Sequence, residues 1–429
     1  MARALAVLVL AALVAPAAAT AHARLVRTVP ADGADVVRAP HQVLVEFDDT
    51  VRASAGNAAV ANTSRRSVLA GAARAHGHVL LLPLRPRLPR GAYTVRWSIV
   101  SEDGHREQGV LAFAVGPTAA PPEPVLAAHA PARARDVALR ALYYFGLLVA
   151  SGATVFALLA RGLLGARLRR PLAGLLFLSL LVAFVGASGL AAGAASGTRF
   201  DVVLEVAVVV ALVGAASAAL APAAAPLLAV SGGCALALTV APALAGHALD
   251  RDQPTVLAPL LDVAHTLAAA VWLGGLVAAS WLLPRASRDT WERRAVLRRF
   301  SSAAVIAVVV VAATGLGRAF TELGGIDHLW TTSYGHALLV KTLLFAALLV
   351  LGSRSRALLE QRSPRLARAI AVEIAAIALI VVVVAVLTQL RPTSETPKRR
   401  AGVGAVTMGA RLAGDRLEEA RRVLERRQP

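Results

Sequence analysis

Two patterns of hydrophobic positions divide this chain. From about residue 136 onward, eight long apolar segments follow one another, each close to the ~20 residues that cross ~30 Å of hydrocarbon. They lie near 138–160, 171–193, 202–221, 227–246, 257–283, 301–317, 336–353 and 370–390. The pattern predicts an all-α polytopic membrane domain of about eight transmembrane helices over residues 136–390.

The first quarter of the chain has a different pattern. Residues 22–116 contain no apolar run long enough to cross a bilayer, and short alternating stretches lie between Gly, Pro and Asp turns. These stretches are 43–47, 79–82, 93–97 and 110–115. They predict an all-β sandwich. A Pro- and Ala-rich linker over 117–135 separates it from the membrane domain, and a basic C-terminal tail occupies 391–429.

The N-terminus has the features of an export signal. Arg3 precedes an apolar stretch over residues 4–15, and small residues follow, so residues 1–21 are predicted to be a signal peptide. Three overlapping small-x-small cleavage sites lie within 17–23, and composition does not choose among them. One of them leaves His22 as the first residue, where a free α-amine beside an imidazole can chelate a metal.

Composition and charge agree with a membrane protein. The chain is 57% hydrophobic with a mean hydropathy of +0.64, too apolar for a soluble chain of this length. Its net charge of +19 comes from arginines scattered between apolar runs, which indicates loop topology and not nucleic-acid binding. If the first segment starts outside, the inner loops hold fifteen arginines and the outer loops three. This bias predicts a protein of the cytoplasmic membrane with its N-terminal domain outside. The same count leaves the tail outside despite its ten basic residues, and that conflict stays open.

One short motif in the N-terminal domain offers donor atoms for a metal ion. Asp103 and His105 are two residues apart after the stretch Tyr93–Val100, and on extended backbone both side chains point the same way. Both can then reach one ion. A surface turn with a capping Asp and a solvated His fits the same spacing.

Five blocks of the N-terminal domain are informative together: His22–Val26, Pro30–Ala34, Val45–Asp49, Gly91–Trp97 and Val100–His105. In this order they resemble the CopC family of extracytoplasmic copper-binding proteins over essentially all of residues 22–116. The resemblance implies a Greek-key sandwich, cleavage before His22, and a Cu(II) ion held by the terminal amine, His22, Asp103 and His105. Asp49 matches an acidic position near that site.

The donor types agree with cupric copper. Cu(II) accepts tetragonal nitrogen and oxygen ligands, which an amine, two imidazoles and a carboxylate supply. Cu(I) prefers sulfur ligands, and after signal removal the chain keeps only Met408 and Cys234. The methionine-rich Cu(I) site of some CopC proteins therefore has no counterpart. His76 and His78 flank Gly77 and fit either a second metal site or an exposed strand end.

Ionisable side chains inside apolar segments are costly and usually mark a function. Those in or beside the outer halves of the predicted spans are Glu205, His247, Asp262, His265, His336 and Lys341. Asp262 and His265 are three residues apart and share one helix face, on which Trp272 follows. This arrangement fits a shared metal vestibule, and it also fits a histidine paired with a neighbouring helix for packing.

The membrane domain has its own set of informative blocks: Gly246–Ala248, Asp262–His265, Trp272–Gly275, Arg299–Ser301, Thr314–Gly315 and Trp330–Lys341. They resemble the CopD family of copper-transport membrane proteins, most strongly over 246–345. The resemblance implies that His247 and His265 contact copper and that Asp262 orients them. Fusion of a CopC-like to a CopD-like domain is similar to the YcnJ type of copper resistance and uptake protein.

These patterns predict a copper-binding membrane protein and not an enzyme. It would capture Cu(II) outside and pass it to or through the membrane domain, for import or homeostasis. The sequence has no Walker A and no C-P-C motif, so ATP is not its direct energy source. Because cytosolic copper is expected as Cu(I), a separate copper reductase is an expected partner. Two alternatives stay open: a copper- or haem-dependent membrane redox enzyme, and a copper buffer or sensor without transport.

Overall fold

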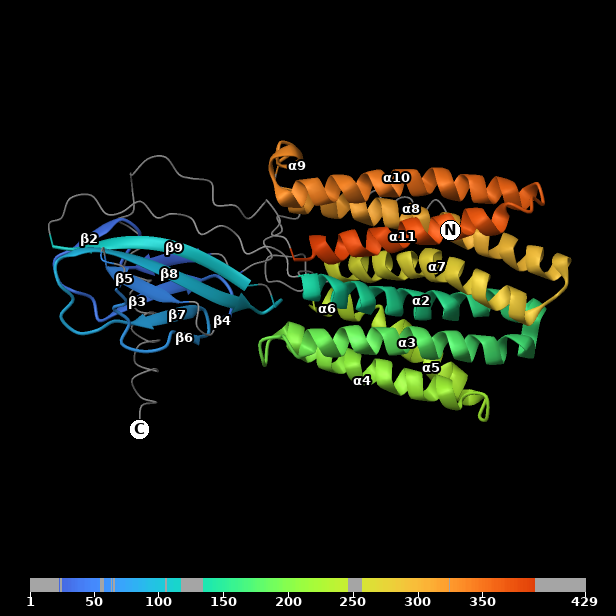
Figure 1. Cartoon of the computed structure of the whole chain (residues 1–429), viewed down its shortest axis with the longest axis horizontal. Helices are drawn as coiled ribbons and strands as arrows, with labels where there is room; N and C mark the ends of the chain where they lie inside the picture. Colours follow the sequence, from blue (N-terminus) through green and yellow to red (C-terminus); the bar gives the residue numbers. More distant parts are fainter. Residues whose placement is uncertain are drawn as a thin grey trace. The chain divides into compact units, whose positions relative to one another are not determined.

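The structure, a computed structural model, describes residues 23, 25–54, 58–62, 64, 66–104, 106–116, 134–245, 257–323 and 325–389. They form an N-terminal β-sandwich and a helical domain (Figure 1). The predicted signal peptide and the tail 391–429 lie outside the described residues. So does the predicted linker up to residue 133, and the first described helix begins at Ala134.

The sandwich consists of two sheets. The first is antiparallel with the strand order β1 (Leu25–Val29), β3 (Gln42–Phe47), β7 (Val79–Pro83) and β6 (Arg74–His76). The second has the order β2 (Ala34–Val36), β9 (Arg106–Val115), β8 (Gly91–Ser101) and β4 (Val51–Ala53), and β5 (Ala59–Asn62) also pairs with β8. Only the pairing of β2 with β9 is parallel among these strands.

The sandwich core follows from the alternation in the sequence. Val43, Val45 and Phe47 of β3 are buried, as every second residue of a strand faces the same side. Phe47 meets Trp97 of the other sheet edge-on, with ring centroids 5.1 Å apart. The four predicted alternating stretches all form strands, namely β3, β7, β8 and β9. Strands of three residues, such as β2, are too short to show a period and were not predicted.

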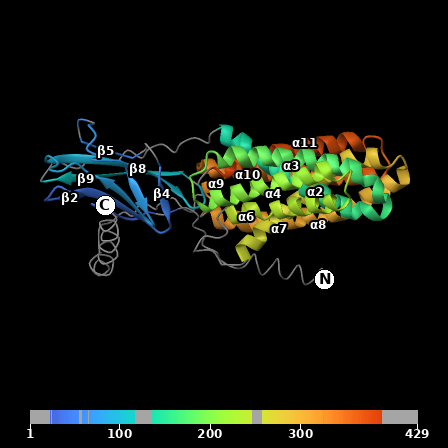
Figure 2. The same cartoon turned by 90° about the horizontal axis from the view of Figure 1, so that it is seen from below.

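The helical domain consists of helices that run side by side in both views (Figures 1 and 2). Their bounds are α2 (Ala134–Leu164), η1 (Gly165–Leu168), α3 (Arg169–Ala191), α4 (Arg199–Leu220), α5 (Pro226–Leu238), α6 (Ala241–Ala245), α7 (Leu257–Ala286), α8 (Thr290–Leu323), α9 (His328–Thr331), α10 (Ser333–Glu360) and α11 (Leu366–Leu387).

Seven helical stretches of the described chain are long and apolar enough to cross a membrane. The first, Ala134–Ala191, has 58 residues and comprises α2 and α3 joined by η1, so about eight spans are present. The predicted helical membrane domain is confirmed, and the protein is a multi-pass membrane protein. Several helices extend past the predicted apolar windows, because a helix continues into polar residues beyond the hydrocarbon.

The fourth predicted segment is not one continuous helix. Its described residues form α5 and α6, with a break at Thr239 and Val240. Pro242 explains the break, because it has no backbone N–H and its ring clashes with the carbonyl four residues earlier. That carbonyl belongs to Leu238, the last residue of α5.

Glycines bring α2 and α7 into close contact. A Cβ atom added to Gly152 would lie 2.0 Å from the carbonyl oxygen of Ala270, and one added to Gly274 would lie 2.2 Å from that of Leu148. Only glycine permits this approach at either position. Small residues at such a crossing are typical of membrane helices, which gain stability mainly from close packing.

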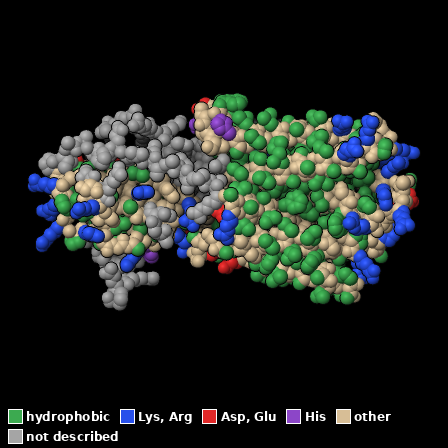
Figure 3. Space-filling model, viewed as in Figure 1, with side chains coloured by type: hydrophobic (Ala, Val, Ile, Leu, Met, Phe, Trp, Pro, Cys, Tyr) green, Lys and Arg blue, Asp and Glu red, His purple; other side chains and the backbone are tan. Residues whose placement is uncertain are grey.

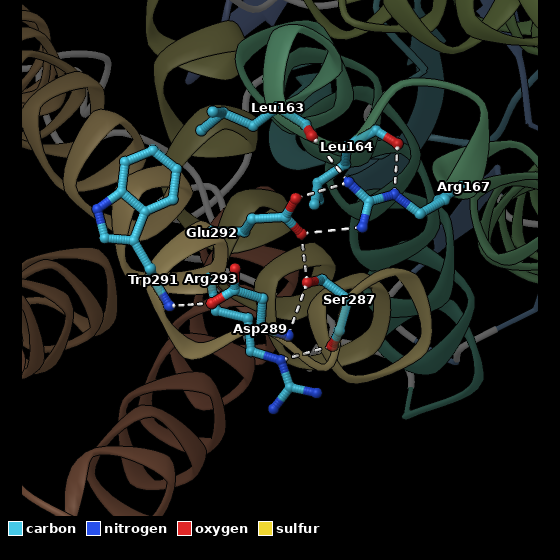
Figure 4. Close-up of polar contacts among 8 residues, drawn as sticks. All are labelled: Leu163, Leu164, Arg167, Ser287, Asp289, Trp291, Glu292 and Arg293. Carbon is cyan, nitrogen blue, oxygen red and sulfur yellow. Dashed lines mark hydrogen bonds and ion pairs between the residues drawn. The ribbon is translucent and has the colours of Figure 1, made fainter.

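Charge is distributed unevenly along the helical domain. Figure 3 shows a broad apolar surface and a cluster of basic side chains at one end. That arginine-rich end is formed by the connections between α2 and α3, α7 and α8, and α10 and α11. At this end both guanidinium NH2 groups of Arg167 contact the Glu292 carboxylate at 2.8 and 2.9 Å, and the Ser287 hydroxyl donates to the same carboxylate at 2.5 Å (Figure 4). This ion pair, the Arg167–Glu292 fork, joins the α2–α3 connection to the α7–α8 connection.

Candidate functional site

The turn between β8 and β9 carries the predicted acidic ligand. β8 ends at Ser101 and β9 begins at Arg106, and the amide of Gly104 donates to the Ser101 carbonyl at 2.9 Å. Gly104 has a φ of +82°, which glycine adopts without steric cost. Asp103 is 3% exposed and accepts a hydrogen bond from the Ser101 hydroxyl. Asp103 is therefore not the solvated surface aspartate of the alternative interpretation.

Strand register brings a second aspartate to the same end of the sheet. Val51 at the start of β4 pairs with Ser101 at the end of β8. Asp49 lies two residues before Val51, and Asp103 lies two residues after Ser101. Both aspartates therefore lie beyond the same end of these two strands. Asp49 is half-buried, and its Oδ1 accepts a hydrogen bond of 2.7 Å from the following amide.

The two predicted imidazole ligands, His22 and His105, lie outside the described residues. Within the described residues, no group of three or more His, Cys, Asp or Glu side chains is placed to hold a metal ion. Of the predicted ligands, the structure therefore describes only the carboxylate, Asp103. The complete ligand set of His22, Asp103 and His105 stays a prediction.

A further histidine reaches this end of the sandwich. The amide of Val51 donates to the carbonyl of Gly77 at 2.9 Å, which joins the β6–β7 turn to the start of β4. His78 follows Gly77, is half-buried, and has a buried Nδ1 atom without a hydrogen-bond partner in the part of the chain described. An exposed strand end, one of the two interpretations of this pair of histidines, fits His76 and does not fit His78.

Within the helical domain, His265 of α7 is joined to α8. Its Nδ1 lies 2.7 Å from Oγ1 of Thr314. The Thr314 hydroxyl donates its only proton to the carbonyl of Val310 at 2.7 Å, so its oxygen accepts from His265. With Nδ1–H as the donor, this bond orients the imidazole relative to α8. A hydrogen bond to one ring nitrogen is how second-shell groups orient the histidines of metal sites.

The other predicted membrane residues are placed differently. Asp262 shares the face of His265 on α7 and is half-buried, and His247 lies outside the described residues. Glu205 and His336 are exposed, and Nε2 of His336 donates to a backbone carbonyl at 2.8 Å. The helix of Glu205, α4, packs mainly against α3, α5 and α6, whereas α7 packs mainly against α2 and α8. The structure does not gather all the predicted ionisable residues into one vestibule.

A buried acid that sequence reasoning missed, Glu373 of α11, contacts α7 two helical turns beyond His265. Nε1 of Trp272 donates to Oε1 of Glu373 on α11 at 3.0 Å, and the hydroxyl of Ser355 on α10 donates to Oε2 at 3.0 Å. Glu373 is 2% exposed. It was missed because ionisable residues were sought near the outer ends of the spans. The available signal was a single acid within the apolar segment 370–390.

Comparison with known families matches one segment of each domain. Residues 25–116 match the CopC domain, and residues 294–387 match Copper resistance protein D, the CopD family. The chain joins a CopC domain to a CopD domain. The resemblance found in the sequence blocks is thus confirmed for both parts.

Individual proteins are also similar to this CopC–CopD chain. The Copper transport protein CutJ of Bacillus subtilis (strain 168) is homologous to it, with 29% identity over 410 residues that cover 87% of this chain and 75% of CutJ. Protein YobA of Escherichia coli (strain K12) is 33% identical over 98 residues, 22% of this chain and 79% of YobA. The crystal structure of CopC from Methylosinus trichosporium OB3b is 26% identical and covers 23% of this chain and 97% of that chain, with a TM-score of 0.21.

The matched ranges locate the described residues within the two domains. Asp49, His78 and Asp103 belong to the CopC domain. Thr314 and Glu373 belong to the matched part of the CopD domain, whereas His265 lies on the preceding helix α7. The bonds from His265 to Thr314 and from Trp272 to Glu373 therefore each join α7 to the CopD segment.

Proposed function

We propose that this CopC–CopD protein captures Cu(II) outside the cytoplasmic membrane and passes it to its helical domain for copper import. The observation that carries this proposal is Asp103, a carboxylate buried in the β8–β9 turn of a CopC domain that is fused to membrane helices. A carboxylate in this turn is an oxygen donor that can coordinate a cation such as Cu(II). The name of the relative CutJ, a copper transport protein, is consistent with this role.

The orientation follows from charge. Basic residues gather at the arginine-rich end of the helical domain, and the positive-inside rule assigns that end to the cytoplasm. The helix that follows the CopC domain, α2, ends at the arginine-rich end, so its first residue, Ala134, is on the outer side. The CopC domain is then extracytoplasmic, as an export signal over residues 1–21 predicts.

The outer ligand set is the mature amine and imidazole of His22 together with Asp103 and His105. Nitrogen and oxygen donors of this kind suit Cu(II), which heads the affinity order of the divalent metals. Asp49 lies at the same end of the sheet as Asp103 and supplies negative charge near the ion. Tethering the CopC domain to the membrane domain keeps captured copper at a high local concentration beside the helices.

In the helical domain, His265 is the residue proposed to receive copper. The contact of its Nδ1 with Thr314 orients the imidazole within the helical domain. His247 and Asp262 are proposed to contribute beside it. The chain itself performs no catalysis in this proposal, so a separate reductase must convert Cu(II) to Cu(I) for use in the cytosol.

The outer site is tested on the secreted, full-length protein by intact-mass analysis combined with a Cu(II) titration. We expect a mature chain that begins at His22 and binds one ion tightly at neutral pH. Acidification should release the ion, because a protonated imidazole and amine cannot coordinate. A mature chain that begins elsewhere, or that ignores Cu(II), would contradict the proposed capture step.

Transport is tested by copper uptake into vesicles that contain the full-length protein. His265→Ala should abolish uptake, whereas His336→Ala should leave it unchanged, because His336 is exposed and bonded to a backbone carbonyl. A buffer or sensor would show no copper flux even in the wild type. A reduced-minus-oxidised absorption spectrum with haem bands would instead support the redox-enzyme alternative.

A further inference from the structure

We propose that Glu373 is a proton-binding site in the membrane domain and that copper entering this domain displaces its proton. The inference rests on the proposed copper transport and supplies a driving force, which the absence of an ATP-binding motif leaves open. Ionisable residues within membrane helices are by default functional. Glu373 is such a residue, at 2% exposure.

The surroundings of Glu373 do not neutralise a carboxylate. Its two hydrogen-bond donors, Trp272 and Ser355, are both uncharged, and no ion pair joins Glu373 to another described residue. A Cβ atom added to Gly352 would lie only 3.4 Å from Oε1, so the acid is closely packed on that side as well. A buried charge of this kind is costly, and binding a proton removes it.

The helices packed against α11 are α2, α7 and α10, and their central parts contain no charged residue. Ionisable residues lie on either side of these central parts and at the start of α11. They are Arg140, Tyr143, Tyr144 and Arg161 on α2, Asp262, His265 and Arg285 on α7, Lys341, Arg354, Arg356 and Glu360 on α10, and Arg365 and Arg368 on α11. Arg354, Arg356 and Arg368 are exposed. Glu373 is therefore the one acid within this apolar zone.

The two hydrogen-bond donors of Glu373 relate this acid to the two ends of the domain. On the outer side, His265 lies seven residues before Trp272 on the same face of α7, about 10 Å away along the helix axis. Toward the arginine-rich end, Ser355 lies five residues before the end of α10, about 7.5 Å along its axis. Glu373 is thus placed between the proposed copper residue and the cytoplasmic surface.

The proposed coupling follows from charge. While the copper position at His265 is empty, the carboxyl of Glu373 holds a proton and is neutral. A copper cation at His265 favours a compensating negative charge nearby, so the O–H bond of Glu373 breaks and the proton passes to water at the cytoplasmic end. When copper leaves to the cytoplasm, a proton returns to the carboxylate from water on the outer side. Each cycle therefore carries one proton inward with the copper ion, and no oxidant or reductant is needed.

The test uses full-length protein in liposomes that contain a pH-sensitive dye, with copper uptake measured in parallel. In the wild type, copper addition should release protons, and copper binding should strengthen by about tenfold more per unit rise in pH than the histidine ligands alone produce, where a single carboxyl titrates. Glu373→Gln keeps the shape and an acceptor for Trp272 but cannot titrate, so we expect uptake without proton movement and with only the pH dependence of the histidine ligands. Glu292→Gln, an acid in the fork at the arginine-rich end, is the matched control and should behave like the wild type.

A second measurement does not depend on transport. The infrared difference spectrum between copper-loaded and copper-free protein should show loss of a protonated carboxyl band in the wild type and no such loss in Glu373→Gln. If copper moves but protons do not, and the band is absent, Glu373 is a packing residue and the coupling is wrong while the transport proposal stands. If the wild type moves no copper, the transport proposal fails, and the infrared difference alone decides whether copper displaces this proton.

Discussion

Thr314 of α8 accepts a hydrogen bond of 2.7 Å from Nδ1 of His265 on α7 while its own proton goes to the carbonyl of Val310. One hydroxyl therefore orients an imidazole within the membrane domain by a bond between two helices. Copper transfer through His265 can therefore be tested by substituting Thr314 as well as His265.

Thr314→Val should lower the rate of copper uptake into vesicles by about 10- to 100-fold, the usual effect of losing a second-shell partner. Valine keeps the shape of the side chain but removes the acceptor for Nδ1–H. Thr342→Val is the matched control, because Thr342 makes the same bond to its own helix and is exposed. Equal uptake by the two variants would show that this hydrogen bond does not serve copper transfer.

Asp103→Asn should weaken Cu(II) binding by the CopC domain by more than about 10-fold, since it removes a charged ligand while keeping the side-chain size. The measurement is a Cu(II) titration of the full-length protein at neutral pH. Asp35→Asn is the control, because Asp35 is exposed on β2. Should both variants bind Cu(II) as the wild type does, Asp103 is buried for a structural reason and is not a ligand.

Trp272→Phe should destabilise the helical domain by about 1–3 kcal/mol, because the buried Oε1 of Glu373 loses its donor. Thermal unfolding in detergent measures this effect. Trp281→Phe provides the comparison, since Trp281 is only partly buried and donates to the carbonyl of Pro171 at 3.2 Å. A smaller loss of stability for Trp272→Phe than for Trp281→Phe would argue against a firm bond between Trp272 and Glu373.

Gly152→Ala should destabilise the packing of α2 against α7 by about 1–3 kcal/mol, the usual cost of an overpacked contact. The added Cβ would lie 2.0 Å from the Ala270 carbonyl oxygen, and backbone atoms cannot move aside as a side chain does. Gly233→Ala is the control, because nothing lies within 4 Å of its added Cβ and alanine favours a helix. Unfolding midpoints that fall equally for both would contradict the close approach of the two helices.

Much of the architecture is determined by the sequence alone. Long apolar segments require helices in a bilayer, because no water satisfies the backbone there, and strict alternation requires strands with one buried face. The blocks around Asp103 and His265 likewise identified both domains before any coordinates. The break between α5 and α6 was open to prediction from Pro242, but hydropathy averaged over the segment does not register one residue.

The partners of the functional side chains were decided only by the tertiary structure. His265 and Thr314 are 49 residues apart in the chain, and Trp272 and Glu373 are 101 apart. A period of 3.6 residues tells which residues share a helix face, but it does not tell which helix lies opposite that face. That choice depends on how the helices pack, including contacts as close as that of Gly152 with α7, and it brings Glu373 of α11 against Trp272 of α7.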